Sequence, residues 1–195
     1  VILRAASGAE FTGDAAVIAV PLPKLKRLIG TLGLPALMRT AIEGRVMGAA
    51  AKLNTAVSGN APPKGIQAPN APWWSWSTAA NDGEVARGSL TSYAGGKATM
   101  ASLKLNEGPA HWLQQTRAYR TDLEVSDDCV LTNWETDPHA EGAYSMPGLE
   151  WHPEQDRVFD QKVGAIAFAG EHTHYASLNG ALESGARAAK LLTLI

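Results

Sequence analysis

The chain has 195 residues, of which 45% are hydrophobic and 18% are charged, and its net charge at pH 7 is −2. This composition is typical of a globular protein and excludes an intrinsically disordered chain, while the near-neutral charge gives no electrostatic basis for binding nucleic acid or an anionic membrane. The single cysteine, Cys129, excludes an internal disulfide framework, and no apolar run approaches the length of a membrane span.

The first third of the chain is predicted to form short strands, then two helices, then a longer strand. The strands at the start end abruptly at Pro21, as a proline-rich turn requires. The longer strand carries Lys52. The predicted ranges are strands at 1–4, 11–12 and 15–20, helices at 25–31 and 35–44, and a strand at 45–57.

The middle of the chain begins with a loop at 59–72 that is too polar and too rich in proline to be a core element. Trp73, Trp74 and Trp76 follow this loop. Two interpretations of them stay open: they line a substrate entrance or a partner surface, or they alternate along a half-buried strand. Further elements are predicted as a strand at 88–93, a helix at about 107–121 and a strand at 129–134.

The end of the chain is predicted to form a strand, a tight turn and a helix. The strand, at 163–169, is apolar nearly throughout, as in a sheet covered on both faces. The helix carries small and apolar residues at helical spacing, so its backbone can lie close to what it covers. The turn carries Glu171, and the N–H groups and dipole of the helix point at one place. This arrangement suits a flat ligand that becomes negatively charged, such as a reduced flavin ring.

Lys52 is the residue that most strongly indicates chemistry. It is the only charge in the small and apolar run 48–53, and a lysine held there must find a partner or lose its charge. The alternative is a lysine that is solvated at the edge of a sheet. The residues alone leave both interpretations open.

His172 and His174 raise the question of a metal site, because imidazoles are common ligands of zinc and copper. The two histidines lack the i, i+4 spacing of a helical ligand pair, and the sequence specifies no third ligand. We therefore expect no metal.

Three segments of the chain resemble the flavin-dependent amine oxidases, the family of the monoamine and polyamine oxidases and their demethylase relatives. They are the turn and helix at 168–189, the G-x-x-x-K spacing that ends at Lys52, and the W-x-x-D-P and G-A-Y-S motifs between Trp134 and Ser145. The resemblance covers essentially the whole chain, but only the C-terminal part of the family. It implies an α/β (α+β) fold that forms the C-terminal part of a two-domain FAD-dependent oxidase.

The resemblance also implies a domain layout. Strands of the FAD domain are expected at 1–21, a substrate-binding domain with a mixed sheet at 22–125, and a return to the FAD domain at 126–195. No GxGxxG turn, which holds a dinucleotide pyrophosphate, occurs in the 195 residues. The N-terminal dinucleotide-binding βαβ unit is therefore expected to be absent from this chain, which would be a subunit or fragment whose N-terminal partner carries the GxGxxG motif.

By the same resemblance, Lys52 is the catalytic residue and holds a water against N5 of the flavin. Glu171 binds the ribityl and phosphate portion of FAD. The complete set of expected cofactor-binding residues is Trp134, Gly142, Ala143, Gly170, Glu171, Ser177, Leu178 and Ala181.

Tyr144 is expected to form one wall of the aromatic substrate cage of the family. The second wall corresponds to Ser177, with Tyr175 as the candidate for that wall from a displaced position. The cysteine that carries FAD covalently in some monoamine oxidases corresponds to Ala143. FAD is therefore expected to be bound non-covalently.

The expected reaction is the FAD-dependent oxidation of an amine to an imine, which water hydrolyses, with reduction of O2 to H2O2. The expected partners are a small-molecule amine and O2, with no nucleic acid and no membrane, and the expected location is the cytoplasm because no targeting segment is visible. Two alternatives stay open: a non-catalytic fragment or interaction module, and a flavin dehydrogenase or desaturase that does not use amines. The residues do not distinguish a monoamine from a polyamine, an amino acid or a cyclic amine.

Overall fold

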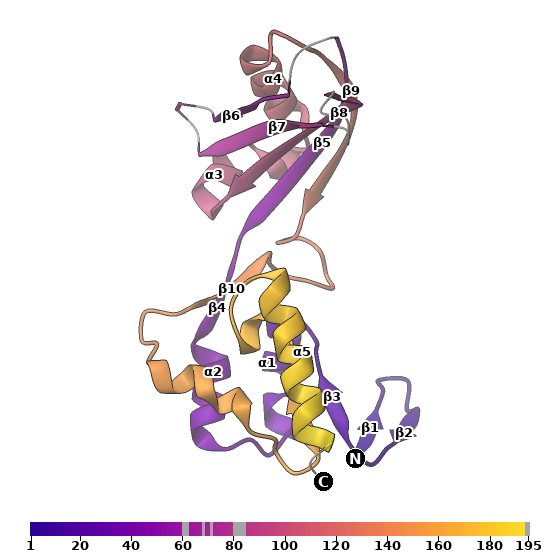
Figure 1. Ribbon diagram of the computed structural model, residues 1–195, viewed down its shortest axis with the longest axis vertical. Coiled ribbons are helices and arrows are strands. Elements are labelled where there is room, and N and C mark those ends of the chain that lie inside the picture. The colour runs from indigo at the N-terminus through magenta and orange to yellow at the C-terminus, as the bar shows by residue number, and fades with distance from the viewer. Residues whose placement is uncertain (60–62, 68, 71, 80–84, 194–195) are drawn as a thin grey trace. The chain divides into compact units, whose positions relative to one another are not determined.

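The computed structural model describes residues 1–59, 63–67, 69–70, 72–79 and 85–193, and it divides into two compact units (Figure 1). Val1–Met47 and Tyr144–Ile195 form one, which we call the terminal unit. Gly48–Ala143 form the other, which we call the central unit. The expected layout, with an FAD domain up to residue 21 and from residue 126, stays a prediction.

The terminal unit combines short strands with helices that start beside prolines. Proline is favourable there because it lacks an N–H group, which would have no partner in the first turn of a helix. Pro23 accordingly lies inside the first turn of α1, whereas the sequence predicts a start at residue 25. The elements are β1 (Ile2–Arg4), β2 (Glu10–Thr12), β3 (Ala16–Ile18), α1 (Leu22–Leu28), α2 (Ala36–Gly44), β4 (Arg45–Gly48), β10 (Tyr144–Pro147), β11 (Ile166–Phe168) and α5 (Leu178–Thr193), with 3₁₀ helices at Ile29–Thr31, Pro153–Asp160 and Glu171–Thr173.

The core of the terminal unit lies around a parallel pair of strands. β3 and β11 pair with Phe168 opposite Ile18, and both residues join a buried cluster with α1, α2 and the 3₁₀ helix Pro153–Asp160. On the other side, α5 packs against β11 through Ala167 and Ala188. β11 is shorter than the predicted strand at 163–169, because Val163 turns back to bridge Ile166. The turn after β11 therefore starts from a firmly packed strand.

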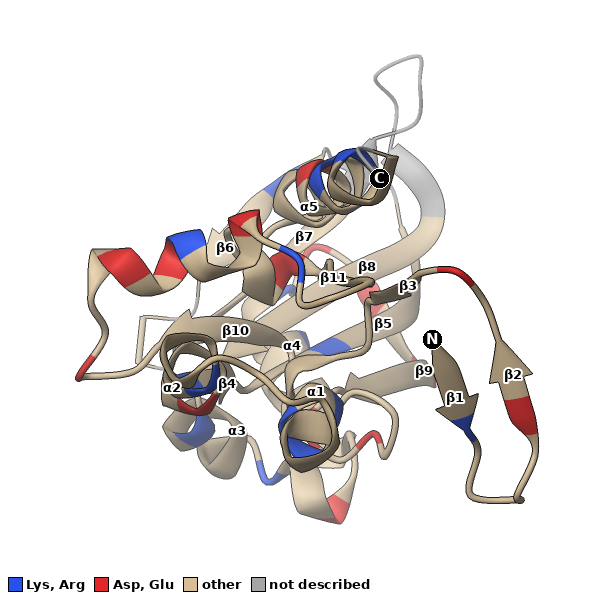
Figure 2. Cartoon of the chain, turned by 90° about the horizontal axis from the view of Figure 1, so that it is seen from below, with Lys and Arg blue, Asp and Glu red and all other residues tan. Residues whose placement is uncertain are grey.

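β1 and β2 form an antiparallel hairpin at the start of the terminal unit. Arg4 on β1 forms an ion pair with Glu10 on β2, visible as one blue and one red segment in Figure 2. Ile2, Leu3 and Phe11 are exposed. The hairpin thus gains little from burial within the described part of the chain.

The central unit is a five-stranded sheet with the strand order β6-β7-β8-β5-β9. All pairs recorded among these strands are antiparallel, so the expected mixed sheet is wrong for the described strands. One face is covered by helices, and Leu53, Trp73, Met100 and Trp112 pack in the core between them. The elements are β5 (Ala50–Ser58), β6 (Gly65–Gln67), β7 (Trp73–Ala79), β8 (Val85–Gly95), α3 (Lys97–Ser102), a 3₁₀ helix (Leu105–Glu107), α4 (Ala110–Tyr119) and β9 (Glu124–Asn133).

Several predicted boundaries of the central unit differ from the structure. The strand predicted at 45–57 is interrupted at Ala49, the predicted loop 59–72 contains β6 and includes residues 60–62, 68 and 71 outside the described part, and β9 starts earlier than residue 129. Helix α3 is not predicted from the sequence. It spans only Lys97–Ser102 and follows Gly96, whose φ of +87° ends β8, so it is too short to show an apolar stripe.

Candidate functional site

The turn between β11 and α5 is built on Gly170. Its φ is +121°, and a Cβ at this position would lie 2.5 Å from Cε1 of His172, so only glycine fits without strain. Its N–H group donates to Oγ of the buried Ser184 on α5 at 2.8 Å. The turn is thus tied to the helix that follows it.

The Glu171 carboxylate is held by a serine from a distant part of the chain. Ser145, on β10, donates its N–H to the two carboxylate oxygens at 3.0 and 3.2 Å and its hydroxyl to Oε2 at 2.8 Å. A carboxylate has about four acceptor positions, so these two donors leave room for the hydroxyl of a ligand. Glu171 is only half-buried, and its free acceptor positions are therefore accessible.

Arg187 fixes the other side of the same turn. Its guanidinium donates to the Thr173 carbonyl at 3.0 Å, to the Thr173 hydroxyl at 2.8 Å and to the Phe168 carbonyl at 3.4 Å. Burial lowers the pKa of Arg187, and the Asp160 carboxylate partly opposes this shift. One side chain of α5 thereby joins the end of β11 to the end of the turn.

His172 is buried in the same turn. Desolvation, together with the charge of Arg45, lowers its pKa to about 4, so the imidazole is neutral at physiological pH. His174, by contrast, is exposed and pairs with Glu183 at 3.2 Å. In the part of the chain that the structure describes, no three metal-ligating side chains gather at one place.

The first turn of α5 presents both N–H groups and an apolar surface. The Ser177 hydroxyl accepts from the N–H of Gly180 at 2.9 Å, whereas the N–H groups of the first residues of a helix have no acceptor within it. Leu178 and Leu182, one helical turn apart, are 77% and 66% exposed. A flat ring with polar edges fits this combination, and we conclude that the residues present suit a flavin. Gly170, Glu171, Ser177, Leu178 and Ala181, all expected to bind the cofactor, lie together at the junction of turn and helix.

The two tyrosines expected at the substrate cage differ in their surroundings. Tyr144 begins β10 and is half-buried. Tyr175 is 44% exposed, and its hydroxyl donates to Oε1 of Glu183 at 3.2 Å while its ring meets the ring of His174 edge-on at 4.7 Å. The side chain of Tyr175 is thus directed toward α5.

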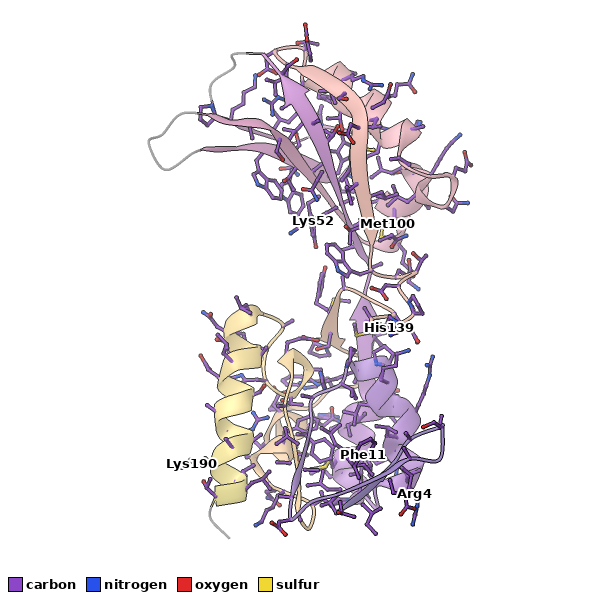
Figure 3. All side chains as sticks on the ribbon, turned by 90° about the vertical axis from the view of Figure 1, so that its right-hand side faces the viewer. Arg4, Phe11, Lys52, Met100, His139 and Lys190 are labelled. Atoms are coloured by element: carbon purple, nitrogen blue, oxygen red, sulfur yellow. The ribbon has the colours of Figure 1, made fainter. Side chains whose placement is uncertain are left out.

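Lys52 lies on β5, which is an interior strand between β8 and β9. The interpretation of Lys52 as an edge lysine is therefore wrong. It is half-buried, it lies opposite Tyr93 on β8 and Thr132 on β9, and its Nζ is 5.9 Å from the centroid of the Trp134 ring. In Figure 3, Lys52 and Met100 mark the open and the helix-covered side of this sheet.

The segment that follows β9 is hydrogen-bonded to Trp134, directly after β9, and to Gly48, the last residue of β4. The Gly142 N–H donates to the Trp134 carbonyl at 2.9 Å, and the Ala143 N–H donates to the Gly48 carbonyl at 2.8 Å. Gly142 needs its glycine because φ is +149°. Trp134, Gly142 and Ala143 belong to the central unit, with Trp134 beside Lys52, whereas the other expected flavin ligands belong to the terminal unit.

Three residues that hold the turn were not predicted. Ser145 lies in the G-A-Y-S motif, where the sequence assigns only the tyrosine, and Ser184 and Arg187 are polar interruptions of the small-residue stripe of α5. A polar residue on a buried helix face is the signal that points to them, since it needs a partner. The partners themselves depend on the tertiary fold.

None of the helices in the described ranges is long and apolar enough to cross a membrane.

A comparison with known families finds that the model of the family described as flavin containing amine oxidoreductase matches residues 1–193. The match covers nearly all of the 195 residues and confirms the resemblance seen in the sequence. Flavin-dependent oxidation and reduction of amines is the chemistry of that family. This chain belongs to the family of flavin containing amine oxidoreductases.

Proposed function

We propose that this protein oxidises an amine to an imine, with non-covalently bound FAD as its cofactor and O2 as the electron acceptor, and releases H2O2. When bound, the flavin accepts two electrons from the amine and passes them to O2. The observation that carries this proposal is the half-buried Lys52 on an interior strand, beside the ring of Trp134. A cation at this position can serve both hydrolysis of the imine and reduction of O2.

Lys52 acts in two ways in this proposal. Its ammonium group has three donors, which can orient a water molecule for hydrolysis of the imine. Its positive charge also stabilises the negative charge that develops on O2 during reduction. The ring of Trp134 restricts the side chain on one side and thereby directs the ammonium group.

The terminal unit supplies the proposed cofactor contacts. Glu171, held by Ser145, accepts a hydrogen bond from a hydroxyl of FAD, and the first turn of α5 contacts the ring through Ser177, Leu178 and Ala181. Ala143 offers no thiol for a covalent bond. Tyr144 contributes a wall of the substrate site, with Tyr175 as the candidate for the second wall.

A partner segment or subunit with a GxGxxG turn completes the cofactor site in this proposal. The 195 residues contain no such turn. Among the described strands, β3 and β11 pair only with each other, although parallel strands are usually buried within larger sheets. The sheet therefore has edges on which further parallel strands can pair.

The amine claim is tested by mixing the flavin-loaded protein with a panel of amines and measuring flavin absorbance and peroxide. We expect amines to bleach the flavin and O2 to restore its colour with release of H2O2. The rate should rise between about pH 6 and 9, because an amine must lose its proton before it is oxidised. A flat profile over this range, or reduction by non-amine substrates alone, would contradict the proposal.

Lys52→Met tests the role of the lysine. We expect reoxidation of the reduced flavin by O2 to slow by about 100-fold, with the flavin still bound, because Met keeps the length of the side chain but removes its charge. Lys190→Met, on the exposed face of α5, is the matched control. Unchanged reoxidation in Lys52→Met would show that the assigned role is wrong.

A further inference from the structure

The tryptophan cluster at 73–76 is divided between the two faces of the central sheet. Trp73 points into the core, where its ring meets those of Trp112 and Tyr119 edge-on, and its Nε1 donates to Gln115 at 2.9 Å. Trp74 points to the opposite face and is 42% exposed. The core accounts for the first tryptophan but not for the second.

Trp74 belongs to a row of side chains that crosses the open face of the sheet. Strand pairing places Trp74 opposite Tyr93, and Tyr93 opposite Lys52. The rings of Trp74 and Tyr93 are stacked, with centroids 4.6 Å apart and planes tilted by 38°. Trp134 lies on the other side of Lys52, so aromatic rings flank the lysine on both sides.

The Tyr93 ring lies against the glycine two residues later. A Cβ on Gly95 would lie 3.4 Å from Cε1 of Tyr93 and 3.7 Å from its hydroxyl, so the ring lies over Gly95. Gly95 is opposite Ala50, the residue two positions before Lys52. The Tyr93 ring therefore lies beside these two small residues, on the face of the sheet that carries Lys52.

Lys52 is the only charged side chain in its row and in the adjacent row of this face. The row that contains Lys52 consists of Gln67, Trp74, Tyr93, Lys52 and Thr132. The adjacent row, with Trp76, Thr91 and Asn54 at its centre, also has no carboxylate. Glu135, next to Trp134, pairs with Lys97 at 3.3 Å. A polycation would therefore meet Lys52 without a compensating acid on either row.

We propose that Trp74 and Tyr93 bind the apolar, planar body of the substrate, and that the substrate is a monoamine with an aromatic ring rather than a polyamine. This inference rests on the proposed function, since it takes Lys52 to be near the reacting atoms. Adjacent strands are about 4.8 Å apart, so Tyr93 lies about 5 Å and Trp74 about 10 Å from Lys52 across the sheet. A monoamine with an aromatic ring is long enough to reach from Lys52 to these two rings. Stacking on the rings favours an aromatic body and leaves the amino group toward Lys52.

The test measures the anaerobic reduction of the flavin by three amines: 2-phenylethylamine, butylamine and spermidine. In the wild-type protein we expect 2-phenylethylamine to bind most tightly. Trp74→Ala should raise its Kd by about tenfold, leave the maximal rate of reduction nearly unchanged, and have little effect on butylamine. Trp74→Phe should restore most of the affinity. Val130→Ala, on the same face of the edge strand β9, is a control that should leave the Kd of both 2-phenylethylamine and butylamine unchanged.

Three outcomes would overturn the inference. The first is that spermidine binds more tightly than either monoamine. The second is that Trp74→Ala raises the Kd of 2-phenylethylamine and of butylamine by the same factor. The third is that neither Trp74→Ala nor Tyr93→Leu raises the Kd of 2-phenylethylamine. The second variant keeps the test valid if the first folds poorly, and the flavin content of each variant reports on folding. If these outcomes occur while amines still reduce the flavin, the inference fails and the proposed function stands. If no amine reduces the flavin, both fail.

Discussion

The turn after β11 and the open face of the central sheet both carry candidate site residues, but they hold them in different ways. In the turn, hydrogen bonds donated by Ser145 and Arg187, and one accepted by Ser184 from the Gly170 N–H, fix backbone and carboxylate atoms in place. On the sheet, Trp74 and Tyr93 are held by stacking and strand register. A hydrogen-bonded turn tolerates few changes, whereas side chains on an open face can change without moving the backbone. The difference suits a constant cofactor and a variable substrate.

The largest effect is expected where the turn is most constrained, at Gly170. Gly170→Ala combines a strained φ with a clash against His172, and we expect it to lower the free energy of unfolding by about 3–5 kcal/mol. Gly185→Ala, in the middle of α5, is the matched control. Its added Cβ meets no atom within 4 Å, so it should raise stability by about 0.5–1 kcal/mol. Urea unfolding of both variants measures this difference in stability. Equal effects of the two substitutions would contradict the prediction.

An intermediate effect on the free energy of unfolding is expected when the pH is lowered. The folded-state pKa of His172, about 4, is below the ordinary value of 6.5, so the unfolded state binds the proton first as the pH falls. The contribution of His172 to stability is therefore fully present above pH 6.5 and is lost between pH 6.5 and about 4. Between pH 6.5 and 5 we expect a loss of about 2 kcal/mol.

Urea unfolding at several pH values measures this loss, with His172→Gln as the comparison. The variant should have a flatter profile over the same range, because glutamine does not titrate. The same slope in both proteins would show that other groups cause the acid sensitivity. On the open face of the sheet, Trp74→Ala should leave the slope unchanged.

The smallest effect is expected at Ser145. Ser145→Ala removes one hydrogen bond to Glu171 and keeps the bond from the backbone N–H, so we expect about 1 kcal/mol less binding free energy for FAD. Titration of FAD into the cofactor-free protein, together with its natural partner where there is one, measures this as a Kd about fivefold higher. Ser58→Ala, which removes an exposed bond to Glu124, is the control. An unchanged Kd in Ser145→Ala would show that Glu171 does not take part in cofactor binding.

The sequence predicts the local elements better than their contacts. The strand, turn and helix at the end of the chain could be predicted because apolar runs, glycine and small-residue spacing are local signals. The interior position of Lys52 could not, because it depends on β8 and β9 pairing on both sides of β5. Likewise, Ser145 reaches Glu171 across 26 residues of sequence, and only the tertiary fold brings them together.

The division of the tryptophans shows the same limit. Alternation along β7 predicts that Trp73 and Trp74 point to opposite faces, but not which face the helices cover. α3, which contributes Met100 to that cover, is too short for a periodic signal. The face that remains open, and with it the row beside Lys52, therefore had to come from the structure.

Amine oxidation by this protein is tested most directly by anaerobic mixing of the flavin-loaded protein with 2-phenylethylamine, followed by addition of O2. We expect the flavin band to bleach as the amine is oxidised, and O2 to restore the band with one H2O2 released per amine consumed. A flavin that stays oxidised with every amine tested would contradict it.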